Sequence, residues 1–502
     1  MPPTERAAGW ITWLPWVATA GALTALVLFV AQHAFSIYDD AYIYFRYADN
    51  LAAGCGPAFN CGDAPVEGFT SPLYLALLWL GALLTGDVEA WSQILGTLSL
   101  GAALVLAIRL ARTGGETVSV PLGAACALSV AGVLAADHHL LLNAVSGLET
   151  PLAAACIVAL AGAVLRKDNT WTAVWVLTGV LLRPECGVFV LLLPMLPWMR
   201  TRRSVAAVVA SLAAMTAIRW LVFGDVLPNT YWAKAGGTPQ HAELGLTYLA
   251  ECVRTFPLLL LAPFVLFVRE RRREHAYLLA GMALWCAYFF RTGGDHFAYA
   301  RLVVPLVPAA TALAFVGLTT LPRPTDPRLR LALLGAVAVA TGLRAGIRHH
   351  VPEAHGFSNV QRWTRVGRWL RTHHRGDTMA TIPVGAMAYT SGLHTLDLVG
   401  ITTAEVARSG NGLPPELVRR AWLGHERHNT PWVLGQAPEL IVTTKFRDQP
   451  WRHLDEVKAG FYADWLLLQE IKAGRAAYDI YDAEIEPGVH WLMYRRRDLA
   501  SP

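Results

Sequence analysis

Charged residues are scarce in this 502-residue chain: 16% are Asp, Glu, Lys or Arg, against roughly 25% in typical soluble domains. Apolar residues make up 54%, and the mean hydropathy is +0.37. One buried core cannot hold so much apolar sequence, whereas a helix of about 20 apolar residues spans a bilayer. This composition excludes a cytosolic enzyme and a disordered scaffold. The net charge of +5 is too small to indicate a nucleic-acid partner.

Cysteine is also sparse, and the seven cysteines show no spacing typical of a metal site. We therefore predict neither a metal site nor a required cofactor, and leave a divalent cation open. Five cysteines lie in or beside apolar segments, where they act as small hydrophobes. Cys55 and Cys61 share one polar loop and can pair if it faces an oxidising compartment. The first apolar run is too long for a signal peptide, so we expect an uncleaved membrane helix.

Apolar runs indicate about eleven transmembrane helices. A twelfth run, 72–84, is short for a span and more typical of a re-entrant or interfacial helix. The eleven runs are 11–34, 91–110, 119–136, 151–165, 171–182, 185–199, 204–222, 256–268, 275–290, 301–319 and 331–345.

Arginine clusters orient these spans. If 72–84 does not cross, five basic clusters fall on the side of the N-terminus, and the positive-inside rule makes that side cytoplasmic. Carboxylates, histidines and aromatics then gather in the loops on the periplasmic side. The clusters are Arg109/Arg112, Arg166/Lys167, Arg200/Arg202/Arg203, Arg269/Arg271/Arg272/Arg273 and Arg323/Arg328/Arg330.

The tail differs in composition from the rest. It has no run long enough to span; 360–373 has helical periodicity, and 440–444 is typical of a buried strand. The sequence predicts a polytopic α-helical membrane domain at 1–349, with a periplasmic loop at 36–91. A small periplasmic α/β domain follows at 350–502.

Two adjacent carboxylates, Asp39 and Asp40, follow the first membrane run and precede a stretch rich in tyrosine. A carboxylate at the membrane surface that aromatics partly desolvate can act as a general base. The alternative is a helix N-cap with an anion at the positive end of the helix dipole. For the pair together, we favour the catalytic interpretation.

The segment YDDAYIYFRYADNLAAGCGPAFNCGDAPVEGFTSPLY resembles the first periplasmic loop of the superfamily C (GT-C) glycosyltransferases, which use polyprenyl-phosphate sugars. Within them it is most similar to the mycobacterial terminal β-(1→2) arabinofuranosyltransferase family. The paired cysteines depart from that pattern and suggest a local disulfide. Further resemblance lies in Ser146–Thr150, Leu182–Glu185, Pro228–Lys234, Gly385–Arg408 and Gly424-His425.

This resemblance implies a GT-C-like fold in the cytoplasmic (inner) membrane. The implied activity transfers a sugar, expected to be arabinofuranose, from a polyprenyl-phosphate donor to a cell-envelope glycan acceptor in the periplasm. Donor, acceptor glycan and membrane lipids are the expected partners. We rank Asp39 first as the base that takes the acceptor proton, with Asp40 orienting the site or binding the donor.

Cationic and aromatic residues of the outer loops are candidates for the donor phosphate, which leaves as an anion. Lys234 is the strongest, because it lies between an aromatic pair and Gly236-Gly237. Its alternative role is an interfacial lysine that snorkels. The candidates are Lys234, Arg46, Arg183, Arg301, Tyr231 and Trp232.

Sugar or acceptor contacts are expected from a second group of polar residues. Three of them have a structural alternative: Glu67 can cap a short helix, Glu149 can mark a helix start, and His296 can be a structural histidine. The group comprises Tyr44, Glu67, Glu149, Asp295 and His296.

Two other classes of protein fit part of the pattern. A lipid-sugar transporter or flippase would need polar or broken helices near the midplane, and here the spans are mostly Ala, Leu and Val. A catalytically dead receptor would lack the Asp pair. Within the enzyme class, transfer of another lipid-linked sugar to protein or lipid A stays open.

Overall fold

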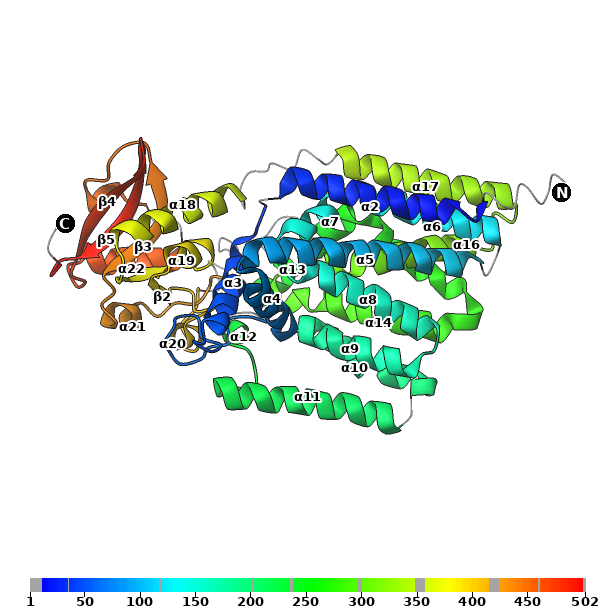
Figure 1. The fold of residues 1–502 in the computed structure, drawn as a ribbon, viewed down its shortest axis with the longest axis horizontal. Coiled ribbons are helices and arrows are strands. Elements are labelled where there is room, and N and C mark those ends of the chain that lie inside the picture. Colours follow the sequence, from blue (N-terminus) through cyan, green and yellow to red (C-terminus); the bar gives the residue numbers. More distant parts are fainter. Residues whose placement is uncertain are drawn as a thin grey trace.

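A bundle of helices with nearly parallel long axes makes up most of the molecule, and a small mixed sheet lies at one end of it (Figure 1). The computed structural model describes residues 11–34, 36–116, 119–199, 202–234, 238–295, 300–347, 357–414, 424–458 and 461–499.

The bundle is held by apolar contacts in which α6 has a central place, since it packs against α2, α5, α16 and α17. Small and branched apolar side chains fill this core. The bundle helices are α2 (Leu14–His33), α5 (Val88–Glu116), α6 (Val120–Ala136), α8 (Thr150–Leu165), α9 (Asn169–Leu182), α10 (Gly187–Leu191), α11 (Arg202–Phe223), α14 (Arg272–Ala287), α16 (Val307–Thr319) and α17 (Pro327–Ile347).

Within the described residues, three helices are long and apolar enough to cross a membrane: Leu14–His33, Val88–Gly114 and Val205–Phe223. Two bent helix pairs raise this number to five if each is one span. Shorter apolar helices, such as Thr150–Leu165, make up much of the remaining bundle. The eleven-span arrangement therefore stays a prediction.

Short elements gather at the end of the bundle that faces the sheet (Figure 1). They come from the segments for which the sequence predicts one common side. These elements are α3 (Asp39–Ala52), α4 (Pro72–Thr85), α7 (His138–Leu142), η1 (Asn143–Val145), η2 (Pro184–Cys186), α12 (Asn229–Ala233), α13 (Pro239–Thr255) and α15 (Phe289–Thr292).

The expected short helix at 72–84 is α4. Pro72 occupies its first turn, where the missing N–H costs nothing, and Gly86 ends it in a left-handed conformation with φ of 68°. Further 3-10 turns interrupt the bundle at η3 (Leu193–Met195), η4 (Pro197–Met199), η5 (Pro257–Leu260), η6 (Ala262–Phe267), η7 (Arg269–Arg271) and η9 (Val304–Leu306).

The C-terminal part is an α/β unit, and the helix and strand expected at 360–373 and 440–444 are confirmed as α18 and β3. The sheet order is β2-β1-β3-β5-β4; β1 pairs in parallel with β2 and β3, while β5 is antiparallel to β3 and β4. The elements are α18 (Phe357–His373), β1 (Thr378–Thr381), α19 (Ala386–Ser391), β2 (His394–Asp397), α20 (Ala404–Ala407), α21 (Thr430–Gly435), β3 (Leu440–Arg447), η12 (Leu454–Glu456), α22 (Tyr462–Lys472), β4 (Tyr478–Glu486) and β5 (Val489–Arg496).

The two faces of this sheet have different neighbours. Alternate residues of a strand point to opposite faces, so Leu440 and Val442 of β3 join a core that also holds residues of α18 and α3. Ile441 belongs to a second core, with α22. The C-terminal part therefore shares one hydrophobic core with α3, and this contact fixes the position of α3.

Candidate active site

Asp39 and Asp40 begin helix α3, and their carboxylates have different partners. Successive residues of an α-helix are rotated by roughly 100° about its axis, so adjacent side chains point in different directions. The start of α3 is anchored where the Tyr38 N–H donates to the carbonyl of Ser146 at 2.9 Å. One carboxylate then meets the C-terminal part, and the other meets a cavity.

Asp39 accepts hydrogen bonds from the backbone N–H groups of Ala386 at 2.8 Å and Gly385 at 3.3 Å. A Cβ at Gly385 would lie 2.0 Å from the backbone oxygen of Asp39, so only glycine permits this approach. Burial raises the pKa of Asp39 to about 7, although the two N–H donors act in the opposite direction. Asp39 does not belong to the described lining of the cavity. We therefore correct its ranking as the first candidate for the base: its side chain ties α3 to α19.

The cavity has a volume of about 320 Å³ and lies between the bundle end and the C-terminal part. Its described lining includes five cationic and four acidic side chains, with aromatic and apolar residues between them. The charged members are Asp40, Glu149, Arg183, Glu185, Arg219, Lys234, Arg291, Asp295 and Arg301.

Arg301 lies between two carboxylates of this cavity. Its Nη1 donates to Asp40 at 2.9 Å, while Nε and Nη2 donate to the two oxygens of Asp295 at 2.6 and 3.3 Å. Asp295 lines the cavity and holds Arg301 with its carboxylate, while its contact with sugar stays a prediction. His296, also expected to contact sugar, lies outside the described residues.

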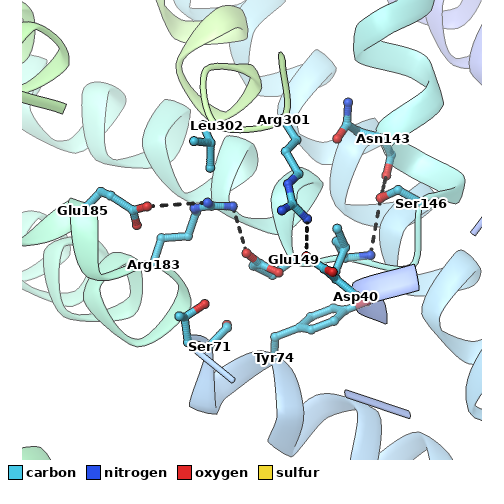
Figure 2. Close-up of polar contacts among 12 residues, drawn as sticks. Asp40, Ser71, Tyr74, Asn143, Ser146, Glu149, Arg183, Glu185, Arg301 and Leu302 are labelled. Carbon is cyan, nitrogen blue, oxygen red and sulfur yellow. Dashed lines mark hydrogen bonds and ion pairs between the residues drawn. The ribbon is translucent and has the colours of Figure 1, made fainter. Parts of the chain in front are cut away.

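Arg183 forms the neighbouring cluster. Its Nη1 donates to Glu149 at 2.8 Å, and Nη2 lies 3.6 Å from Glu185 (Figure 2). Figure 2 also shows Arg301 and Asp40 beside this cluster. Both predicted residues, Arg183 and Glu149, line the cavity, and each is largely buried.

Lys234 and Arg291 are the cations of the cavity without a carboxylate partner in the described parts of the chain. Arg291 donates from Nη2 to the hydroxyl of Tyr231 at 2.9 Å and lies over its ring. Lys234 directly follows the short helix α12, and its side chain is exposed. An anion that enters the cavity can bind both cations without displacing a carboxylate.

Tyr44 lines the cavity, and its phenol oxygen accepts from the backbone N–H groups of Thr70 and Ser71. Glu67 lies behind the described lining. Both of its oxygens accept from Arg219, at 2.6 and 3.0 Å. We therefore correct the expected sugar contact of Glu67: this residue positions Arg219, which does line the cavity.

Arg46 is not at the cavity. Its guanidinium uses all five donors on acceptors near the junction of α3 and the C-terminal part, so the expected phosphate contact is wrong. Trp232 is also outside the described lining. Its Nε1 donates instead to Asp225 at 3.0 Å. The acceptors of Arg46 are the carbonyls of Phe59, Ala388 and Leu393, with Asn60 Oδ1 and Thr395 Oγ1.

Several lining residues were not among the predicted site residues, and Arg219, Arg291 and His425 are three of them. Arg219 is a charge within an apolar run, a pattern that marks functional positions in membrane proteins, and this signal was available. Arg291 follows the apolar run 275–290 and resembles an ordinary flanking arginine. His425 comes from the tail, and no local pattern connects it to residues near 40 or 300.

A disulfide joins Cys55 and Cys61 in the segment that follows α3. The same segment carries Asn60, an acceptor for Arg46. Across the described residues, no group of three or more His, Cys, Asp or Glu side chains is placed to hold a metal ion.

A family model described as a domain of unknown function, DUF8728, matches residues 353–483. The search of curated proteins gave no match.

Two solved structures share this fold over nearly the whole chain. ArnT from Cupriavidus metallidurans, bound to undecaprenyl phosphate, is 12% identical with a TM-score of 0.55, and the match covers 97% of this chain and 98% of that one. AglB, an oligosaccharyltransferase from Archaeoglobus fulgidus in complex with an inhibitory peptide and a dolichol-phosphate, is 9% identical. Its TM-score is 0.52, over 96% of this chain and 74% of that one. The chain therefore shares the fold of these two proteins.

Proposed function

We propose that this protein is a membrane glycosyltransferase that moves a sugar from a polyprenyl-phosphate donor to a glycan acceptor. The observation that carries the proposal is the cavity at the bundle end. It combines Asp40, the most exposed of its ion-paired carboxylates, with two cations, Lys234 and Arg291, that have no carboxylate partner within the described structure. The GT-C fold supports the same reaction class.

In the proposed reaction, an acceptor hydroxyl oxygen attacks the anomeric carbon of the donor sugar. The bond from that carbon to the phosphate oxygen breaks, and polyprenyl phosphate leaves as an anion. Asp40 takes the hydroxyl proton as general base, and Lys234 and Arg291 stabilise the phosphate. Direct displacement of this kind inverts the anomeric configuration.

Arg301 and Arg183 have a positioning role in this scheme. Arg301 is fixed by both oxygens of Asp295 and presents one N–H to Asp40, so it holds the base on the cavity wall. Arg183 does the same for Glu149, which we assign to the sugar or acceptor hydroxyls. Because these carboxylates are already held in position, less free energy is needed to orient the reactants.

Helix α11 offers a surface to which the apolar isoprenoid tail of the donor can bind. This helix contributes Met215 and Arg219 to the cavity, while Leu221 and Trp220 of the same helix are 75% and 60% exposed. Such an apolar surface suits contact with lipid chains. We assign the isoprenoid to this side, with its phosphate at Lys234 and Arg291.

For the finer identity, we propose arabinofuranose as the sugar and a periplasmic cell-envelope glycan as the acceptor. The resemblance of the segment from Tyr38 to Tyr74 to the arabinofuranosyltransferase loop supports this choice. We further propose that 350–502 acts as a domain on the periplasmic face of the inner membrane.

The test is an assay of purified protein with a panel of polyprenyl-phosphate sugars that includes arabinofuranose, mannose and aminoarabinose donors. The linkage of each product is determined. The purified protein is also reconstituted into proteoliposomes, in which movement of the donor across the bilayer is measured. Transfer of arabinofuranose with inversion is expected. Donor movement without any glycosidic product would contradict the proposal and favour a flippase.

A further inference from the structure

A track of aromatic and imidazole rings leads from the cavity onto the outer surface of the C-terminal part. It ends at Trp465 on α22, which is 45% exposed and stacks on Tyr462 with ring centroids 5.7 Å apart and planes 18° apart. An isolated exposed aromatic side chain needs no explanation. A stacked pair of rings that lies near a candidate active site does need an explanation.

The connection runs through two histidines of one short segment. His425 lines the cavity and lies 5.7 Å, centroid to centroid, from Phe461. Three residues on, His428 meets Tyr462 edge-on at 5.4 Å. Phe461 and Tyr462 are adjacent in the chain, so these ring pairs are neighbours along it, and we call the set His425, Phe461, His428, Tyr462 and Trp465 the ring track.

This segment is fixed to both parts of the molecule. Arg427 donates from Nε to the carbonyl of Trp232 at 3.2 Å, next to the cavity residue Tyr231. Leu413 donates its N–H to the carbonyl of Glu426 at 3.0 Å. The side chain of Glu426 accepts from the N–H of Gly424. The track is therefore held in register with the cavity.

The chemistry of the track suits a neutral carbohydrate chain. Sugar rings present C–H faces that lie flat on aromatic rings, and their hydroxyls hydrogen-bond to polar groups at the edges of such rings. Burial lowers the pKa of His428, which favours its neutral form at physiological pH. An anionic ligand would instead find its partners at the cations inside the cavity.

We propose that the ring track from His425 to Trp465 binds the acceptor polysaccharide beyond the sugar unit that receives the transferred residue. This inference rests on the proposed function, since it places the acceptor chain across the mouth of the proposed catalytic cavity. It assigns the C-terminal part a task of its own, to recognise acceptor length and to deliver the reactive hydroxyl toward Asp40.

The experiment measures binding of linear arabino-oligosaccharides of increasing length, and of a matching mannose series, to the purified full chain in detergent. Trp465→Ala is compared with Phe446→Ala. Phe446 is a suitable control because it is 41% exposed on the same C-terminal part, yet stacks on Trp491 away from the track.

The expected result is that wild-type affinity rises with oligosaccharide length and that Trp465→Ala weakens binding of the longest member by about fivefold or more. Disaccharide binding, and all binding by Phe446→Ala, should be unchanged. Length-independent binding by the wild type, or equal effects of the two substitutions, would overturn the proposal.

Two further outcomes would assign the track to another occupant and overturn the proposal. One is weaker association of Trp465→Ala with vesicles of anionic lipid while oligosaccharide binding stays intact. The other is a loss of self-association. Binding is measured without donor, so length-dependent binding supports the track even if no donor is consumed. If the protein transfers sugar but its oligosaccharide affinity does not depend on length, the proposed function is supported and the role of the ring track is refuted.

Discussion

The guanidinium of Arg301 donates to the carboxylate of Asp40 at 2.9 Å, although the two residues lie 261 positions apart. The same arginine binds both oxygens of Asp295. Asp40 is thus fixed on the cavity wall with its side chain 32% exposed, which leaves it accessible to an acceptor. In contrast, the adjacent Asp39 is bound to backbone of the C-terminal part.

Lys234→Ala should raise the donor KM, or lower turnover, about tenfold or more, since charge-assisted contacts contribute about 1.5–3 kcal/mol. The melting temperature should hardly change, because the exposed Lys234 side chain makes no hydrogen bond or ion pair among the described residues, and its backbone N–H still donates to the carbonyl of Thr230 in the variant. Steady-state kinetics with varied donor provide the measurement. Arg254→Ala, an exposed cation of α13, is the control. Unchanged donor kinetics would contradict the phosphate contact and indicate that Lys234 is an interfacial lysine that snorkels.

Asp39→Asn should change how stability depends on pH. Asp39 has a pKa of about 7 in the folded protein against an ordinary 3.8, so between these values the folded state binds more protons. The free energy of unfolding therefore falls as pH rises through this window. An asparagine cannot titrate, so the wild type should lose melting temperature relative to the variant between pH 4 and 7.

Melting curves of both proteins in detergent across that range test this prediction. Asp464, whose pKa burial also raises to about 7, is present in both proteins and cancels in the difference. Parallel curves for wild type and Asp39→Asn would show that Asp39 does not titrate as described.

Arg46→Lys should destabilise the junction between α3 and the C-terminal part. Lysine has three donors against the five that Arg46 uses, so at least two of the buried hydrogen bonds of this charged group are lost. We expect a loss of at least about 2 kcal/mol in unfolding free energy. Denaturant titration measures it, with Arg475→Lys at an exposed ion pair as control. Equal stability of both variants would contradict the structural role.

Reporter fusions should place residues 115 and 350 on opposite sides of the membrane, with 115 cytoplasmic. The reason is that five basic clusters fall on one side when 72–84 does not cross. A periplasm-active and a cytoplasm-active reporter at each position provide the measurement. The same side for both fusions would refute the eleven-span arrangement.

Local patterns predicted much of the fold. The short helix α4, the helix α18 and the strand β3 follow from apolar periodicity and from Pro and Gly at the ends. The cavity residues near Asp40 come from loops that the arginine pattern places on one side. Periodicity and charge are local properties, so they are readable without the structure.

The direction of each side chain could not be predicted in this way. Whether Asp39 or Asp40 faces the cavity depends on Gly385 and Ala386, about 346 positions away, which dock against the start of α3. Arg46 similarly looks like a free cation until Ala388 and Leu393 supply its acceptors. These contacts form only when the C-terminal part packs on α3.

The most direct test of the central claim is the transfer rate of Asp40→Asn compared with wild type and Asp39→Asn at saturating donor and acceptor. The substitution removes the base but little volume, so we predict a loss of at least about hundredfold in kcat with donor affinity and melting temperature retained. Asp39→Asn should keep most of its kcat wherever it stays folded. Wild-type turnover by Asp40→Asn would contradict the account.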